Sequence, residues 1–204
     1  VPTIIYDMLS LKDSDFLVKA NHKDLRFGLL KDGEITQLYN SFSDCLNTNN
    51  EEEVWSVFCS NTKTKLKPDR TKMLNATYLG GILELFDLDE NCRLSLNKTL
   101  YIYELKYGIA EGAIPAYVVS NETTQIGFED VYATNNSIYA LLHNRGNEAL
   151  PSEITVFSWQ GLPTSKIKAN HGLVNIAVDE KNNLIYVIAE SEQNAYELSC
   201  LSLN

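Results

Sequence analysis

The chain has 204 residues, 44% of them hydrophobic, and can therefore bury a core without disulfide bonds or a structural metal. Its 27 acidic and 17 basic residues give a net charge of −10, which argues against nucleic acid, because a phosphate-binding surface needs an excess of Lys and Arg. No apolar run is long enough for a transmembrane helix, and the first residues lack the basic start and long apolar core of a signal peptide.

The first half of the chain contains two predicted strand units, residues 3–40 and 53–105. In the first, DFLVKA reads as a strand, and LRFGLLKDGEITQLY reads as two strands joined by a turn at Asp32-Gly33. The second unit repeats this order with KMLNATYL and ILELFDLDENCRLSL, which turns at Glu90-Asn91. Apolar and polar residues alternate as half-buried strands require. An insertion at about 107–123 breaks the pattern and reads as irregular structure.

The second half contains two further units, residues 126–169 and 173–204. GFEDVYATNNSIYALL and LVNIAVDEKNNLIYVIA both read as an apolar strand, a polar turn containing Asn-Asn, and a second strand that begins near Ile-Tyr. Aligning Ile138 with Ile185 gives a repeat period of 47. Between them, EITVFSWQGLPTSKIKA reads as two strands with a turn at Gln160-Gly161, where Gly supplies the positive φ that a hairpin favours.

Four antiparallel strands in each repeat of about 45 residues are typical of a β-propeller blade. The sequence therefore predicts an all-β propeller of four-stranded antiparallel blades, at least four of them, within a single domain spanning residues 1–204. An antiparallel β-sandwich is the rival architecture, but a sandwich does not require repeated unit sequences.

The segments GFEDVYATNNSIYALL, SEITVFSWQGLP and NIAVDEKNNLIYVIA resemble the TolB-like six-bladed β-propeller family of bacterial exported proteins, relatives of NHL and YVTN propellers. The resemblance is best over residues 100–204. It implies export, often as a lipoprotein, and a periplasmic or cell-surface location. The family is largely uncharacterised, and no catalytic motif defines it, so the resemblance leaves enzyme activity open.

Six blades need about 270 residues at this period, whereas four units can be read here. Either N-terminal blades are absent from this chain, or the ring closes by strand exchange. In favour of the second alternative, VPTIIY at the N-terminus resembles LPTSKI, the expected outermost strand of the third unit.

Candidate site residues gather in the loops expected at one end of the propeller. We name the strands of each blade a to d, from the channel outward, so that b–c and d–a loops lie at the same end. The candidates in or beside these loops are His22, Glu129, Asp130, His143, Arg145 and His171. Glu129 and Asp130 begin strand a of the third unit and are expected near the channel mouth.

These residues predict a polar pocket, which a divalent metal ion could occupy, because imidazole and carboxylate groups are common ligands of such ions. Alternatively, short polar loops have collected histidines by chance. No catalytic motif of a hydrolase and no phosphate-binding loop is present. The favoured function is therefore a non-catalytic binding propeller that engages a protein or a glycan. The alternative is a metal-assisted hydrolase or lyase with its site at the channel mouth.

Overall fold

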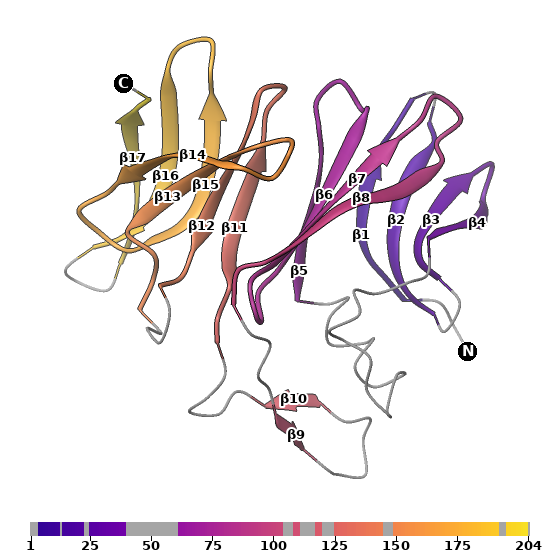
Figure 1. Ribbon diagram of the computed structural model, residues 1–204, viewed down its shortest axis with the longest axis horizontal. Helices are drawn as coiled ribbons and strands as arrows, with labels where there is room; N and C mark the ends of the chain where they lie inside the picture. The colour runs from indigo at the N-terminus through magenta and orange to yellow at the C-terminus, as the bar shows by residue number, and fades with distance from the viewer. Residues whose placement is uncertain are drawn as a thin grey trace.

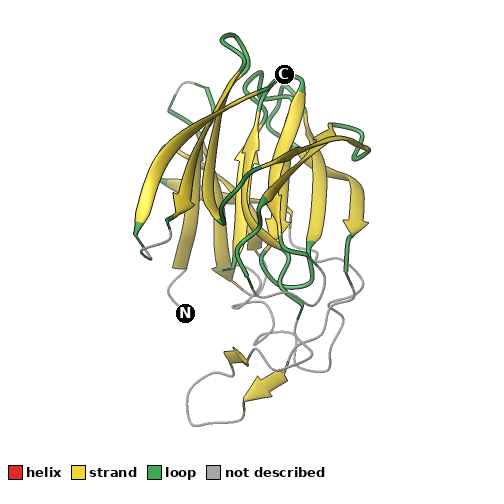
Figure 2. Ribbon diagram, turned by 90° about the vertical axis from the view of Figure 1, so that its left-hand side faces the viewer, coloured by secondary structure: helices red, strands yellow, loops and turns green. Residues whose placement is uncertain are grey.

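The computed structural model shows an arrangement built from β-strands (Figures 1 and 2). The structure describes residues 4–12, 14–22, 25–39, 61–103, 108–110, 117–119, 125–144, 149–191 and 195–203. Within these ranges no helix is present, and therefore none that could cross a membrane. Residues 4–203 contribute four successive antiparallel sheets, each of three or four strands, so the all-β propeller architecture predicted from the sequence is confirmed.

The first two sheets, blades 1 and 2, are four-stranded, with the strands in chain order. The strands of blade 1 are β1 (Ile4–Ser10), β2 (Phe16–His22), β3 (Leu25–Lys31) and β4 (Glu34–Tyr39). Those of blade 2 are β5 (Thr62–Leu66), β6 (Lys72–Thr77), β7 (Ile82–Leu88) and β8 (Leu94–Tyr101).

In the part of the chain that the structure describes, blade 3 has four strands and blade 4 has three. The strands of blade 3 are β11 (Phe128–Ala133), β12 (Ser137–Leu142), β13 (Glu153–Ser158) and β14 (Pro163–Lys168). Those of blade 4 are β15 (Leu173–Asp179), β16 (Leu184–Glu190) and β17 (Tyr196–Ser202). In the described residues the ring of blades is not closed.

The insertion between blades 2 and 3 is not wholly irregular, as the sequence led us to expect. Strands β9 (Gly108–Ala110) and β10 (Tyr117–Val119) pair as an antiparallel two-stranded sheet. In Figure 1 this small sheet lies below the blades, at one end of the propeller. The insertion therefore extends the molecule at the end where the candidate site was expected.

The N-terminal strand belongs to blade 1, which argues against the strand-exchange alternative. β1 is the innermost strand of that blade and pairs with β2, with Ile4 opposite Asn21 and Ser10 opposite Phe16. The described part of VPTIIY, from Ile4 onward, therefore begins the innermost strand of its blade, whereas LPTSKI contributes the outermost strand of blade 3.

A β-bulge recurs near the start of strand a in blades 1, 3 and 4, and it aligns these three blades residue by residue. The bulge separates Ile5 from Asp7, Phe128 from Asp130, and Leu173 from Asn175. From blade 3 to blade 4 the strand-a positions are therefore 45 residues apart. The strand-b positions keep the period of 47, because four residues separate the paired Ala133 and Ile138 in blade 3 and six separate the equivalent Val178 and Ile185 in blade 4.

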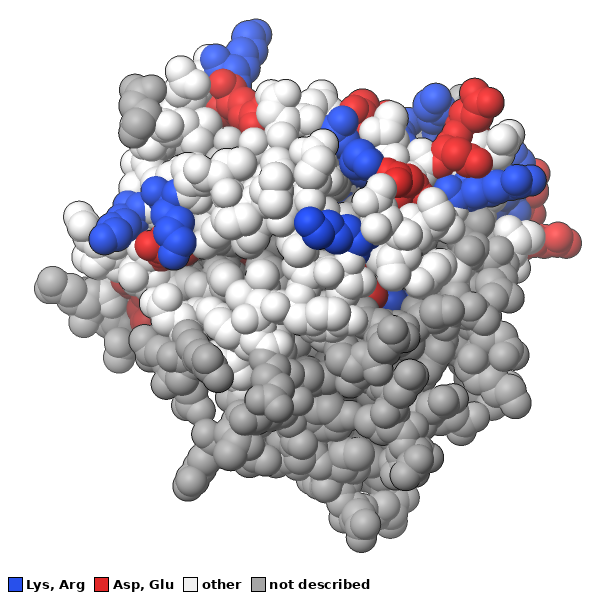
Figure 3. All heavy atoms as spheres, viewed as in Figure 1, with Lys and Arg blue, Asp and Glu red and all other residues white. Residues whose placement is uncertain are grey.

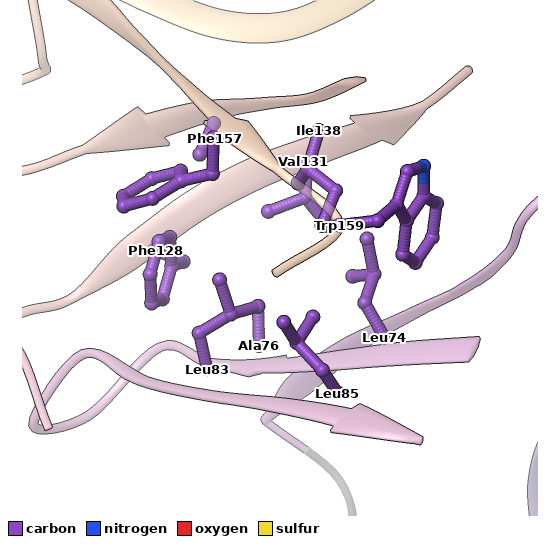
Figure 4. Close-up of a cluster of buried hydrophobic side chains, with 10 residues drawn as sticks. Leu74, Ala76, Leu83, Leu85, Phe128, Val131, Ile138, Phe157 and Trp159 are labelled. Atoms are coloured by element: carbon purple, nitrogen blue, oxygen red, sulfur yellow. The ribbon is translucent and has the colours of Figure 1, made fainter. Parts of the chain in front are cut away.

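Hydrophobic side chains pack between neighbouring blades rather than within a single sheet. Phe128, Val131 and Phe157 of blade 3 meet Leu74 and Leu83 of blade 2 (Figure 4). Two comparable clusters fill the contacts between blades 1 and 2 and between blades 3 and 4. Burial of apolar surface between blades therefore holds successive blades together.

A buried polar network also joins blades 1 and 2. Arg26 on β3 forms a bidentate ion pair with Glu84 on β7, with Nη1 3.0 Å from Oε1, and both side chains are at most 3% exposed. Asn75 Nδ2 donates to Glu84 Oε2 at 3.0 Å, and Thr64 Oγ1 donates to Asn75 Oδ1 at 3.0 Å. The Glu84 carboxylate is therefore held by partners from two blades.

Candidate functional site

The strand order places the b–c and d–a loops at one end of the propeller and the a–b and c–d turns at the other. His143 follows β12 and lies in the b–c connection of blade 3, whereas Asn135 lies in the a–b turn of the same blade. The two residues are thus at opposite ends of the β11–β12 hairpin, as the strand assignment required. We call the end that carries His143 the b–c end.

At the b–c end, His143 and Glu129 form a hydrogen-bonded pair. His143 Nε2 lies 3.0 Å from Glu129 Oε2, and the imidazole side chain is 2% exposed while the Glu129 side chain is 21% exposed. No described residue gives His143 Nδ1 a hydrogen-bond partner. If Nε2 carries the proton and donates to the carboxylate, Nδ1 is a buried acceptor without a donor, an arrangement that costs free energy.

Two tyrosines from blade 2 and the segment that follows it surround the histidine. Tyr103 Oη donates to the backbone oxygen of His143 at 2.5 Å. The Tyr78 ring meets the imidazole edge-to-face, with ring centroids 6.2 Å apart. Both tyrosines are partly exposed. The Glu129–His143 pair therefore lies where blades 2 and 3 meet, beside aromatic surface.

Gly127 explains why the chain can bring these groups together. Its N–H donates to Tyr78 O at 2.5 Å, and its carbonyl oxygen accepts from His143 N at 2.9 Å. A Cβ at this position would lie 2.2 Å from the Cα of Gly81, in the b–c turn of blade 2. Only a glycine fits so close to a neighbouring backbone, and it joins strand a of blade 3 to blade 2.

Asp130, which the sequence placed near the channel mouth, is buried and connects blades 3 and 4. Its Oδ2 accepts from Ile176 N and from Asn175 Nδ2, each at 3.1 Å. Both donors belong to β15, the innermost strand of blade 4. The carboxylate is therefore engaged in holding blade 4 against blade 3.

The remaining candidates are not brought to this pair by any contact in the described part of the chain. His22 ends β2, where its backbone pairs with Leu25, but its side chain lies outside the described residues. Arg145 also lies outside them. His171 is exposed in the loop before β15 and makes no hydrogen bond or ion pair with another described residue. The site that can be described thus comprises Glu129, His143 and the two tyrosines.

No group of three or more His, Cys, Asp or Glu side chains in the described ranges could hold a metal ion. On the face shown in Figure 3, basic and acidic side chains are interspersed rather than gathered into a patch of one sign. The charges of the described residues on this face therefore favour neither an anionic nor a cationic ligand.

Sequence reasoning found Glu129 and His143 but missed Tyr78 and Tyr103. A signal for Tyr78 was present: it precedes Gly80-Gly81, which the strand pattern had already placed in a b–c turn. Tyr103 lies just after β8, at the start of the d–a connection, and the same rule places it at the b–c end.

The family of this chain is shown by a family model rather than by an individual relative. No curated protein matches the sequence. Among solved structures, the β-propeller domain of Cps50 (Swd1) from Myceliophteria thermophila is similar, with 11% identity, a TM-score of 0.34, and coverage of 93% of this chain and 67% of that one. So distant a similarity says nothing about function. A family model described as "TolB-like 6-blade propeller-like" matches residues 1–181. The chain therefore belongs to the TolB-like six-bladed β-propeller family.

Proposed function

We propose that this chain is a non-catalytic binding propeller that engages a protein or glycan ligand at its b–c end. The observation that supports this proposal is the Glu129–His143 pair. Glu129 Oε2 is held by the imidazole, while Oε1 accepts no hydrogen bond from another described residue. A partly exposed carboxylate fixed by a buried base is suited to accept a hydrogen bond from a sugar hydroxyl or a peptide N–H.

The two neighbouring tyrosines support the same ligand classes. An aromatic ring with a polar tip offers apolar contact area and hydrogen bonding together, which suits the faces of sugar rings and the side chains of peptides. Tyr78 and Tyr103 are both partly exposed and both contact His143. In this proposal Glu129 contacts the ligand, and His143 is a positioning residue that orients the carboxylate.

An array of immobilised glycans and extended peptides, probed with the labelled chain, tests the proposal. We expect binding to a subset of the array, and loss of about tenfold or more in affinity for Glu129→Gln, because a hydrogen bond to a charged group contributes about 1.5–3 kcal/mol. Glu34→Gln is the matched control. It makes the same charge change on an exposed side chain at the start of β4, at the opposite end of the propeller.

Absence of binding to any probe, or equal affinity of wild type and Glu129→Gln, would contradict the proposal. The metal-assisted enzyme is distinguished by a thermal-shift scan with Ca²⁺, Mn²⁺ and Zn²⁺. A plain binding protein shows no stabilisation, whereas a shift that disappears in His143→Ala would favour the enzyme.

We also propose an exported compartment, either the periplasm or the cell surface. The support is membership of a family whose bacterial members are generally exported. Fractionation of the source cells with an antibody against the chain tests this location. Recovery in the cytoplasmic fraction alone would contradict it.

A further inference from the structure

Glu129 differs from Glu84 and Glu180, two other carboxylates at contacts between blades, because it uses little of its capacity to accept hydrogen bonds. It accepts one hydrogen bond, from His143 Nε2, and forms no ion pair with a described Lys or Arg. By contrast, Glu180 accepts from three side chains, and Glu84 is paired with Arg26. An ionised carboxylate offers about four acceptor positions, so Glu129 retains most of them for a ligand.

His143 gives this carboxylate a hydrogen bond but no compensating positive charge. The imidazole is 2% exposed, and its Nδ1 has no hydrogen-bond partner among the described residues. Protonation of both ring nitrogens would bury a charged donor without an acceptor, which costs more free energy than a neutral nitrogen without a partner. The neutral imidazole with its proton on Nε2 therefore fits this geometry, and the Glu129–His143 pair carries one net negative charge.

The two oxygens of Glu129 are not equally available to a ligand. Oε2 lies 3.0 Å from His143 Nε2, whereas Oε1 accepts no hydrogen bond from another described residue. A guanidinium binds a carboxylate best through two parallel N–H···O bonds, one to each oxygen, whereas an ammonium is a compact charge for which one acceptor suffices. The geometry therefore suits the ammonium of a Lys side chain better than the guanidinium of Arg.

Backbone hydrogen bonds from separate segments hold the surroundings of this carboxylate in place. In the b–c turn of blade 2, Gly80 N donates to Gln125 O at 2.8 Å, and Gly80 O accepts from Tyr103 N at 3.3 Å. The Tyr103 hydroxyl in turn donates to the backbone oxygen of His143. The segments on either side of the insertion are thus fixed to one turn next to Glu129, so a ligand would meet a preorganised site.

We propose that the ligand of the b–c end is a protein segment and that Glu129 binds the side-chain ammonium of one of its lysines. This inference rests on the proposed function and selects a basic peptide rather than a glycan. A sugar hydroxyl would leave the charge of the carboxylate uncompensated, whereas an ammonium neutralises it. Tyr78 and Tyr103 are partly exposed beside His143, and the faces of aromatic rings also attract cations.

The array of glycans and extended peptides provides the first test, when the probes that bind are sorted by charge. Binding that depends on Glu129 should be confined to peptides that contain Lys. One such peptide is then prepared with its lysine unchanged, acetylated at Nζ, or replaced by Arg, and fluorescence anisotropy measures each affinity. Acetylation should weaken binding about tenfold or more, because it removes the charge and the ion pair. Replacement by Arg should weaken it less, about threefold, because the fork cannot use both oxygens freely.

Glu129→Gln connects this effect to the carboxylate. The Gln side chain has nearly the same shape and retains an oxygen that can accept from His143 Nε2. The variant should bind the Lys peptide about tenfold or more weakly than the wild type does. Both chains should bind the acetylated peptide equally, because the ion pair is then absent from each complex. Glu34→Gln should match the wild type with both peptides, since Glu34 lies on an exposed strand end far from the site.

The outcomes separate this inference from the proposed function. Glu129-dependent binding to glycans, amino sugars included, or to peptides without Lys would overturn the inference and leave the proposed function in place. Equal affinity of the wild type for the Lys peptide and its acetylated form would overturn it too, and this comparison needs no variant. Absence of Glu129-dependent binding to every probe would contradict both. Circular dichroism verifies that Glu129→Gln is folded.

Discussion

At the scale of single residues, Tyr139 and Glu180 form a titratable contact between blades 3 and 4. Tyr139 Oη lies 3.3 Å from Glu180 Oε1, and that carboxylate also accepts from Thr134 and Asn136. Burial, followed by the charge and hydrogen bond of Glu180, raises the pKa of Tyr139 to about 12. The folded chain therefore holds this proton more tightly than the unfolded chain does.

This raised pKa predicts a loss of stability in alkali. The contribution is fully present below the unfolded pKa of 10.0 and is lost as the pH rises through about 12, because ionised Tyr139 would face the Glu180 carboxylate. Chemical denaturation between these pH values should show a smaller fall in unfolding free energy for Tyr139→Phe than for the wild type. Parallel pH profiles for the two chains would contradict this assignment.

The buried Arg26–Glu84 pair gives a second prediction at this scale. Glu84→Ala should lower the free energy of unfolding by about 3–5 kcal/mol, because it removes the carboxylate that forms a bidentate ion pair with the buried Arg26 guanidinium. Asp87→Ala is the control on the same strand. Its ion pair with Lys72 is partly exposed, so the expected cost is about 0–1 kcal/mol. Urea denaturation measures both, and equal costs would show that Glu84 contributes no more than a surface charge.

For single residues, the sequence could predict which polar side chains lie in which loops, but not which side chains contact one another. Glu129 and His143 were identifiable, because polar residues beside a strand end are visible in the pattern. The hydrogen bond from Lys19 Nζ to Thr62 O, 2.9 Å long, could not be identified from the sequence. The two residues lie in different blades, and which side chains meet depends on how the blades pack.

At the scale of elements, local turn chemistry explains why the strands could be predicted. Asp32 and Gly33 both have positive φ, as do Asn183 and Gly161, and these residues lie in the turns that the sequence indicated. The paired strands of the insertion were missed, because they are three residues long and have no Asn-Gly or Asp-Gly turn. Characteristic turn residues therefore allowed the hairpins to be predicted, whereas short strands without such residues were not predicted.

The junction between blades 2 and 3 yields a prediction for an element. Gly127→Ala should destabilise the chain by about 1–3 kcal/mol or more, because the new Cβ would overlap Gly81 in a closely packed turn. It should also weaken ligand binding at Glu129, since Gly127 O accepts from His143 N. Thermal unfolding and the glycan and peptide array measure the two effects.

Gly33→Ala is the control for Gly127→Ala, because it adds an unfavourable backbone conformation without a steric overlap. Nothing lies within 4 Å of a Cβ at Gly33, but its φ of +83° is unfavourable for other residues, so a cost of about 1–2 kcal/mol is expected. Gly33 is at the opposite end of the propeller, and ligand binding should be unchanged. Normal binding by Gly127→Ala would show that this junction does not position the site.

At the scale of the whole molecule, blades in series behave as a nearly one-dimensional array, in which each blade is stabilised by its neighbours. Among the described residues, blade 2 packs against blades 1 and 3, whereas blade 4 packs against blade 3 alone. Strands β6 and β16 allow a fair comparison, because each is hydrogen-bonded to a strand on both sides. β6 is buried on both faces, but β16 alternates between buried and exposed residues.

Amide hydrogen exchange should therefore be slowest in β6 and faster in β16, because opening a strand that is buried on one face exposes less apolar surface than opening one that is buried on both. Equal exchange in β6 and β16 would contradict the view that neighbouring blades determine the stability of each blade.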